Sequence, residues 1–246
     1  MFRTGDSVLP LHRGGDGVLN FENRSTLEAW RVAWSQLRSS AQPDGLGALL
    51  PNSCRDAPRS ALTAIIVSQA RTSLPRLVAS TRRLDVAASL AAAIPLIGAG
   101  PGLTPSWDDL LIGYMCGLRA TAGTDCRQAR FFGRFGKAVH GASAGTTAVS
   151  REYIQRTVEG TGPEWIEDTL AAIGSGDSAR TFRATARALR IGNTSGTDMM
   201  LGAILGSSAR QASTEAAEVL SVLSCRWSKS LPMRDGNGHP AHAQLV

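Results

Sequence analysis

The sequence predicts a compact, mainly α-helical domain with a short β element in front of it. After residue 25, apolar residues recur every three or four positions, which is the spacing of one helix face. Before that point, residues 7–11 and 17–21 alternate in character and flank a glycine-rich turn, as in a small hairpin. The chain has 246 residues and 43% hydrophobic content, so it is long enough to bury a sizeable core.

Three parts are predicted along the chain. Residues 1–25 form the β-rich segment, residues 26–229 the helical domain, and residues 230–246 a mobile tail. Residues 42–59, which are rich in Pro and Gly, are expected to form a loop. Helices are expected from residue 26, from residue 106, after residue 146, and over 60–71, 82–94, 125–140, 164–173, 179–189 and 214–227.

Two stretches of the helical domain, residues 97–117 and 192–206, repeat one pattern. In each, a serine stands three residues before an aspartate, and glycines follow the aspartate four and eight residues later. We expect each serine to be a helix N-cap and each acid to complete a capping box. The glycines of a pair share one helix face, so the two helices are predicted to pack face to face, with two ordinary capped helices as the alternative. The two sets are Ser106, Asp109, Gly113, Gly117 and Ser195, Asp198, Gly202, Gly206.

Composition argues against several classes of function. The net charge is +6, but the basic residues are scattered arginines with few aromatics among them, so nucleic-acid binding is not expected. The cysteines lie far apart without a Cys-x-x-Cys pair, so neither a zinc site nor a redox site is indicated. Without a signal-peptide pattern or an apolar run of about 20 residues, a cytoplasmic protein that does not bind membranes is expected. No cofactor is expected.

Three segments resemble landmarks of one bacterial family. They are G-A-G-P-G-L-T-P-S-W-D-D-L-L-I-G, T-T-A-V-S and G-N-T-S-G-T-D-M-M-L-G, beginning at residues 98, 146 and 192. In order and spacing, residues 15–210 resemble the AllH-type oxamate carbamoyltransferase subunits. The first landmark is long and specific, whereas the other two are short.

The resemblance implies a subunit of a multi-component cytoplasmic enzyme of anaerobic allantoin breakdown. The reaction would be phosphorolysis of oxalurate to oxamate and carbamoyl phosphate, with partner subunits related to acyl-CoA synthetases. Longer relatives combine this region with N-terminal β structure in an α+β fold. Relatives usually carry glycine where this chain has Trp107. We therefore expect the indole either to stack on residues 192–196 and partly close the pocket, which we favour, or to form one apolar wall of a narrower pocket.

The two helix starts are predicted to form one anion site. Phosphate, carbamoyl phosphate and oxalurate are anions, and backbone N–H groups at a helix N-terminus favour such groups. Within T-T-A-V-S, Thr147 is expected either to cap a helix or to form a third wall of this pocket. The candidate binding residues are Gly100, Gly102, Thr104, Ser106, Asp108, Asp109, Thr147, Ser150, Thr194, Ser195, Gly196 and Asp198.

The acids of this site admit three roles. A carboxylate repels a bound anion unless it is protonated, holds a cation or faces away. Asp109 and Asp198 could bond back to their own N-cap backbone, orient N–H groups of a substrate amide, or bind Mg²⁺ together with Asp108. No catalytic base or nucleophile can be assigned. The function is then either that of an enzyme subunit that binds a carbamoylated acid and phosphate, or that of a non-catalytic anion-binding or assembly module.

Overall fold

The computed structural model describes residues 18–50, 60–123 and 125–210, and the single residues 217, 219 and 221. Within this part, α-helices and short 3-10 helices follow one another, and no strand occurs. The α-helices are α1 (Arg24–Ser40), α2 (Ala61–Arg82), α3 (Val86–Ala93), α4 (Ser106–Ala122), α5 (Cys126–Ala142), α6 (Ala148–Val158), α7 (Glu164–Gly174), α8 (Ser178–Ala188) and α9 (Ser195–Ser208). The 3-10 helices are η1 (Gly45–Leu49), η2 (Ile94–Leu96) and η3 (Ser143–Gly145). The predicted mainly α-helical domain is confirmed.

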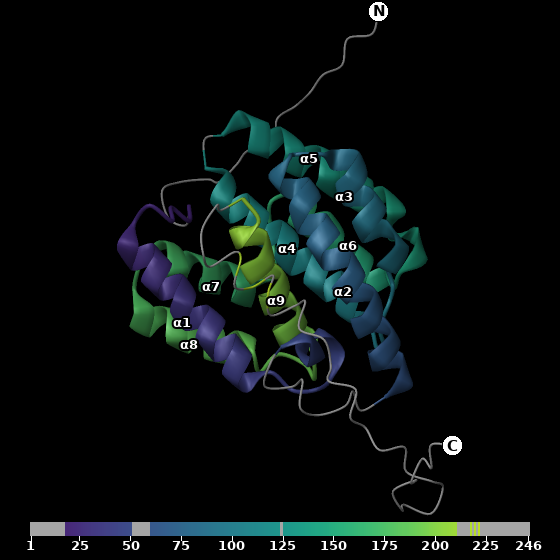
Figure 1. The fold of residues 1–246 in the computed structure, drawn as a ribbon, viewed down its shortest axis with the longest axis horizontal. Helices are drawn as coiled ribbons and strands as arrows, with labels where there is room; N and C mark the ends of the chain where they lie inside the picture. The colour runs from purple at the N-terminus through teal and green to yellow at the C-terminus, as the bar shows by residue number, and fades with distance from the viewer. Residues whose placement is uncertain are drawn as a thin grey trace, which may run out of the picture.

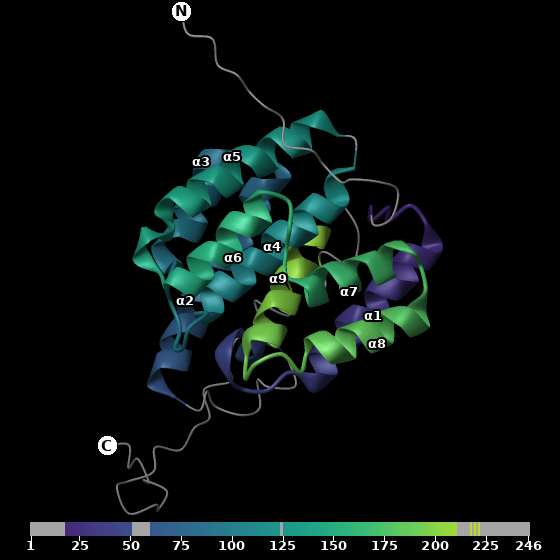
Figure 2. The ribbon, with the colours of Figure 1, turned by 180° about the vertical axis from the view of Figure 1, so that it is seen from behind.

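Helices α4 and α9 form the centre of the domain (Figure 1). Helices α2, α3, α5 and α6 lie on one side of this pair, and α1, α7 and α8 lie on the other, as the opposite view also shows (Figure 2). Every residue of α4 except Thr121 is buried, which accounts for its apolar character on all faces. The two predicted motifs therefore occupy the core of the molecule.

The glycine faces of α4 and α9 meet backbone to backbone. A Cβ atom on Gly113 would lie 1.9 Å from the carbonyl oxygen of Met199, and one on Gly202 would lie 2.0 Å from that of Leu110. The second glycine of each pair approaches the facing backbone almost as closely. The order of these contacts shows that the helices run parallel. Face-to-face packing through the glycines is confirmed.

Buried polar groups tie the outer helices to this central pair. The indole Nε1 of Trp30 on α1 donates to the Ser207 hydroxyl on α9 at 3.0 Å. The Tyr114 hydroxyl on α4 donates to Thr81 on α2 at 2.7 Å. Both aromatic side chains are fully buried, so these bonds satisfy polar atoms that water cannot reach.

Two predicted helix boundaries are wrong. The helix predicted to end at residue 71 continues as α2 to Arg82, with Pro75 inside it. Burial of Leu74 and Leu77 against the core outweighs the helix-breaking tendency of that proline. The helix predicted from residue 82 begins only at Val86, because Leu84 has a φ of 56° and turns the chain between α2 and α3.

Other predictions fall partly outside the described residues. Residues 18–23 contain no strand, whereas residues 1–17 of the predicted hairpin lie outside the described part. The predicted tail, 230–246, and most of the helix predicted over 214–227 also lie outside it. Within the predicted loop 42–59, the structure shows η1, which is buried along its whole length. Among the helices that are described, none has the length and apolar character needed to cross a membrane.

Candidate functional site

The first turns of α4 and α9 lie side by side. The hydroxyl oxygens of Thr104 and Ser195, one beside each helix start, are 2.9 Å apart. Because the helices are parallel, the positive ends of their dipoles are adjacent. Three fully buried acids, Asp108, Asp109 and Asp198, stand in these first turns, where a helix dipole favours negative charge. The structure thus brings the two predicted motifs together in one place.

The helix caps differ from the prediction by one residue. Pro105 is the N-cap of α4 and Thr194 that of α9, and neither makes a side-chain capping bond. Ser106 and Ser195 are instead the first helical residues. The two predicted capping boxes are therefore wrong. Since the fixed φ of proline suits the start of a helix, Pro105 can begin α4 without help from a serine hydroxyl.

Asp198 anchors η1. Its Oδ1 accepts a hydrogen bond from the Leu46 N–H at 2.8 Å, while Asp44, the N-cap of η1, makes no side-chain capping bond. Gly45 has a φ of +54°, and a Cβ atom there would lie 2.7 Å from Asp198 Oδ2, so this approach requires glycine. Burial raises the pKa of Asp198 to about 7, against hydrogen bonds that lower it. The predicted bond from Asp198 to its own N-cap is replaced by this long-range contact.

Asp108 ties two loops to the start of α4. Its Oδ1 accepts from the Gly98 N–H at 2.8 Å, and its Oδ2 accepts from the Thr146 hydroxyl. Burial raises the pKa of this carboxyl, and the bonds from Gly98 and Thr146 and the nearby Ser150 hydroxyl oppose that rise. Both oxygens of Asp108 therefore serve to hold residues 97–105 and the start of α6 in place.

Asp109 differs from both neighbours because neither of its oxygens has a hydrogen-bond partner within the described residues. Burial is the largest cause that raises its pKa to about 8. The hydroxyls of Ser195 and Thr104 lie close enough to lower this pKa without completing a hydrogen bond, and the charge of Asp198 raises it. At neutral pH the Asp109 carboxyl is thus mostly protonated, and it can donate one hydrogen bond and accept others.

Further polar atoms beside Asp108 and Asp198 lack a protein partner. They are Ser106 Oγ, Ser150 Oγ and Asp198 Oδ2, although the Ser106 hydroxyl lies near enough to lower the pKa of Asp198. Buried polar atoms of this kind are uncommon, and a group of them in one place marks a candidate binding site. We call Ser106, Asp108, Asp109, Ser150 and Asp198 the acid cluster. Each of its members has at most 1% of its surface exposed, so a ligand can enter only if covering residues move.

The glycines of the predicted site have different roles. Gly100 has a φ of +139°, and a Cβ atom there would lie 2.4 Å from the Ser106 nitrogen, so the loop backbone covers the start of α4. Gly196 faces the end of α8, since its Cβ atom would lie 2.0 Å from the Ala188 carbonyl oxygen. Gly102 has no atom within 4 Å of such a position. Of the three, only Gly100 lies against the acid cluster.

Some of the N–H groups expected to hold an anion are already bonded. The Trp107 N–H donates to the Ala99 carbonyl at 3.1 Å, and the Gly196 N–H donates to that of Ile191 at 2.9 Å. No basic side chain is among the main causes that shift the pKa values of the three acids. The surroundings of the acid cluster therefore favour a neutral group that carries N–H bonds over a bare anion.

Thr147 is the N-cap of α6, which confirms the first of its two predicted roles. Its hydroxyl oxygen accepts from the Ser150 N–H at 3.1 Å and donates to the Leu103 carbonyl at 2.5 Å. The second bond fastens the exposed end of the loop over α4. Thr194, the remaining candidate, lies beside Gly45, and its hydroxyl helps to lower the pKa of Asp198.

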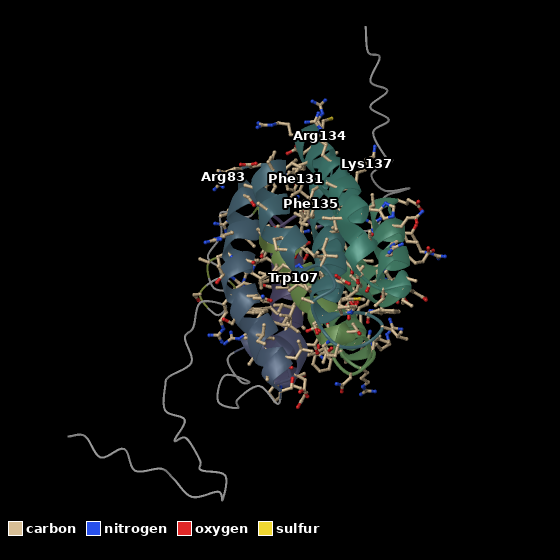
Figure 3. The ribbon with its side chains drawn as sticks, turned by 90° about the vertical axis from the view of Figure 1, so that its right-hand side faces the viewer. Arg83, Trp107, Phe131, Arg134, Phe135 and Lys137 are labelled. Atoms are coloured by element: carbon tan, nitrogen blue, oxygen red, sulfur yellow. The ribbon has the colours of Figure 1, made fainter. Side chains whose placement is uncertain are left out.

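Trp107 does not take the predicted place over residues 192–196. Its indole Nε1 donates to the Ala93 carbonyl at the end of α3 at 3.0 Å, and its side chain is fully buried. Figure 3 shows it deep between the helices. The carbonyl at the end of α3 satisfies the indole N–H inside the core, which explains this direction. The prediction that this ring partly closes a pocket is therefore wrong, and the ring packs in the core instead.

The described residues contain no group of three His, Cys, Asp or Glu side chains placed to hold a metal ion. Asp108 uses both oxygens on Gly98 and Thr146, and Asp198 uses one on Leu46. The Mg²⁺ alternative for the three acids therefore has no support in the geometry.

Sequence reasoning missed the contribution of η1 and of Thr146. Leu46 reaches Asp198 across 152 positions of the chain, and nothing in the local pattern of residues 42–59 indicates that contact. Thr146 stands next to Thr147 in the segment T-T-A-V-S, which the sequence places near the site. Nothing in that segment indicates the bond from Thr146 to Asp108.

Comparison with known proteins bears on the part of the chain that holds this site. No curated protein and no solved structure gives a significant match. One protein-family model does match, and its range includes α4, α6 and most of α9, and with them every residue of the acid cluster. Over residues 96–207 the chain matches the family of the oxamate carbamoyltransferase subunit AllH, which confirms the predicted resemblance for this part of residues 15–210.

Proposed function

We propose that this chain is the subunit of a multi-component oxamate carbamoyltransferase that holds the carbamoyl group of the substrate. The observation that carries the proposal is the Asp109 carboxyl, which is fully buried and without a partner within residues that match the AllH family. A carbamoyl or ureido group carries N–H donors and a carbonyl acceptor. A mostly protonated carboxyl beside the Ser195 and Thr104 hydroxyls complements both kinds of group.

The same carboxyl suits the proton transfer of phosphorolysis. A phosphate oxygen would attack the carbamoyl carbon of oxalurate, the bond from that carbon to the oxamate nitrogen would break, and carbamoyl phosphate would leave. The departing nitrogen needs a proton, and Asp109, with a pKa of about 8, can supply it. The hydroxyl proton of the attacking phosphate then restores the carboxyl. Partner subunits related to acyl-CoA synthetases would supply the cationic groups for phosphate that the acid cluster lacks.

A thermal-shift comparison of the chain and of Asp109→Leu tests this proposal. The ligands are oxalurate, oxamate, carbamoyl phosphate and phosphate. A ligand at a hundred times its dissociation constant adds about 2.7 kcal/mol to the free energy of unfolding. We expect oxalurate or oxamate to stabilise the wild type and Asp109→Leu, which removes both the donor and the acceptor, to bind at least about tenfold more weakly, which is the effect of losing one such bond. Asp177→Leu, at the exposed N-cap of α8, is the matched control and should bind normally. Equal binding by Asp109→Leu would exclude the proposed role.

The enclosure of the acid cluster favours a second candidate, a non-catalytic anion-binding or assembly module. Its residues are at most 1% exposed, and Asp108 and Asp198 hold loops in place. An assembly module would show no thermal shift with any of the four ligands, alone or with its partners, whereas an anion-binding module would bind at least one of them without turnover. The assembly module would still be required for assembly of the complex.

A further inference from the structure

A basic cleft lies between α5 and the turn that joins α2 to α3, away from the acid cluster. Its volume is about 320 Å³. The floor contains half-buried apolar side chains, while guanidinium groups of exposed arginines surround it. No acidic residue lines it. The residues that matter here are Leu84, Val86, Arg83, Arg127, Arg130 and Arg134, and we call this feature the α5 cleft.

The arginines of α5 belong to a longer row of positive charge. Arg127, Arg130, Arg134 and Lys137 recur at helical spacing, so they lie along one face of the helix, and all four are exposed. Figure 3 shows Arg134 and Lys137 pointing outward, with Phe131 and Phe135 on the inner side of α5. From Arg127 to Arg134 the row extends about 10 Å at 1.5 Å per residue. A single phosphate or carboxylate cannot contact both of its ends.

These charges have no partner in the described part of the chain. The guanidinium groups of Arg83, Arg127, Arg130 and Arg134 make no hydrogen bond or ion pair there. The acids nearest in sequence, Asp85 and Asp125, cap α3 and α5 by accepting from backbone N–H groups, and neither pairs with these arginines. Four unpaired cations around one cleft repel each other, and an occupant with negative charge would relieve that repulsion.

Helix α8 provides an internal comparison. It begins a row with the same spacing, formed by Arg180, Arg183, Arg187 and, just beyond the helix, Arg190. Within that row, Arg187 pairs with Asp168 at 3.0 Å. α8 lies on the opposite side of the central helices from α3 and α5 (Figures 1 and 2). The two rows therefore match in charge and spacing, and the α5 row lines a cleft that has a fourth arginine, Arg83, across it.

We propose that the α5 cleft docks an acidic segment of a different protein. Arginine is the basic residue best suited to paired bonds with carboxylates and to protein interfaces, and Leu84 and Val86 offer apolar contact beneath. The undescribed segments of this chain carry no excess of acidic residues, and a second copy would bring a further net charge of +6. Neither complements the cleft. The identification of this acidic protein as a partner subunit of the transferase rests on the proposed function. The inference that the protein is acidic rests on the cleft alone.

The full-length chain and a fluorescein-labelled peptide of ten glutamates test the charge preference by fluorescence anisotropy. The variant Arg127→Glu/Arg130→Glu/Arg134→Glu should bind at least about tenfold more weakly, since three attractive contacts become repulsive. The α8 variant Arg180→Glu/Arg183→Glu/Arg190→Glu makes the same change in net charge and should stay within about twofold of the wild type. Arg127→Gln/Arg130→Gln/Arg134→Gln repeats the test if the first variant does not fold.

Three outcomes would overturn the proposal. One is failure of the wild type to bind the peptide, and another is equal weakening by the α5 and α8 variants. The third is tighter binding of duplex DNA or of anionic phosphatidylserine vesicles through the same arginines, which would make the cleft a nucleic-acid or membrane surface. In a second arm, the α5 variant should no longer co-elute with the partner subunits. If the wild type lacks transferase activity even with the partner subunits present, the proposed function fails while the peptide result still stands.

Discussion

At the scale of single residues, the acid cluster shows that equal burial does not mean an equal role. Asp108, Asp109 and Asp198 are all fully buried in two adjacent helix starts. Asp108 accepts two bonds from its surroundings and Asp198 accepts one from η1, so both stabilise loops. Asp109 alone has no partner for either oxygen. Asp109 is therefore distinguished from the other two acids by its lack of hydrogen-bond partners, and not by its burial or its charge. This makes it the candidate for a reactive group.

Asp109 should make the stability of the protein depend on pH. Its pKa is about 8 in the folded state, above the value of 3.8 for an unperturbed aspartate. Between about pH 4 and pH 8 the unfolded chain releases a proton that the folded protein keeps, so the free energy of unfolding should fall as the pH rises through this window. Each unit of pKa difference corresponds to about 1.4 kcal/mol, and a fall of at least that size is expected.

Urea denaturation of the wild type and of Asp109→Asn at pH 5, 7 and 9 measures this effect. The variant should show a clearly smaller fall, since the raised pKa values of Asp108 and Asp198 still contribute to it, and be the more stable protein at pH 9. Asp125→Asn is the control, because Asp125 is only half-buried at the N-cap of α5 and its pKa is lowered, not raised. That variant should keep the fall seen in the wild type. Parallel pH curves for wild type and Asp109→Asn would contradict the prediction.

Trp107 belongs to the core, and its replacement should act on stability. The side chain is fully buried and bonded to the Ala93 carbonyl, so Trp107→Gly would leave a large cavity and an unpaired carbonyl. We expect a loss of at least about 3 kcal/mol, as for other buried tryptophans. Denaturation measures the loss, and calorimetric titration with oxamate and phosphate tests the binding. Tighter binding by the variant would restore the idea that the indole closes the pocket.

At the scale of elements, the contact between α4 and α9 determines where the site can form. Close packing through glycine places the two helix N-termini side by side, so that the hydroxyl oxygens of Thr104 and Ser195 are 2.9 Å apart. A larger residue at the contact would separate them and spread the acid cluster. The glycines therefore control the geometry of the site although they do not touch a ligand.

Gly113→Ala and Gly202→Ala should each destabilise the protein strongly. Their Cβ atoms would lie 1.9 Å and 2.0 Å from facing carbonyl oxygens, and rigid backbone cannot yield at so small a distance. A loss of about 3 kcal/mol or more is expected, at the upper end of overpacking effects. Gly133→Ala on α5 is the control, because no atom lies within 4 Å of its Cβ position. It should be neutral or gain up to about 1 kcal/mol of helix stability. Similar losses for all three variants, measured by thermal denaturation, would contradict the packing.

Local pattern predicted this pair of helices well because its signals are local. The serine, aspartate and glycine spacings lie within single helices, and the steric demand of two glycine faces leaves few ways to pack them. The same reasoning failed for η1, because the contact of Leu46 with Asp198 joins distant parts of the chain. It also failed for α2, where tertiary burial of Leu74 overrides the local effect of Pro75. The spacing also predicts that Ser106 and Ser195 cap their own helices. The Ser195 hydroxyl instead contacts Thr104 beside the neighbouring helix, and local spacing contains no information about that contact.

At the scale of the whole molecule, a closed polar site and an open basic cleft lie in different places. The acid cluster lies inside the domain, where the first turns of α4 and α9 are adjacent. The α5 cleft opens to solvent between α5 and the turn that joins α2 to α3. The loop over α4 has a solvent-facing part, in which Leu103 is 73% exposed and its carbonyl accepts from the Thr147 hydroxyl. Docking of another protein at the surface and opening of that loop would be separate events, which different variants can test.

The single chain should not transfer carbamoyl groups by itself. The acid cluster is enclosed, and no basic side chain is among the main influences on its acids, so the isolated subunit has little to hold phosphate against three carboxyl groups. A coupled assay for carbamoyl phosphate measures this activity. It should detect no carbamoyl phosphate when the purified chain is given oxalurate and phosphate. The activity should appear when the partner subunits are added and be lost again with Asp109→Asn, while Asp177→Asn retains it. Robust turnover by the single chain would show that the subunit opens and binds phosphate without help, and the need for a partner would be abandoned.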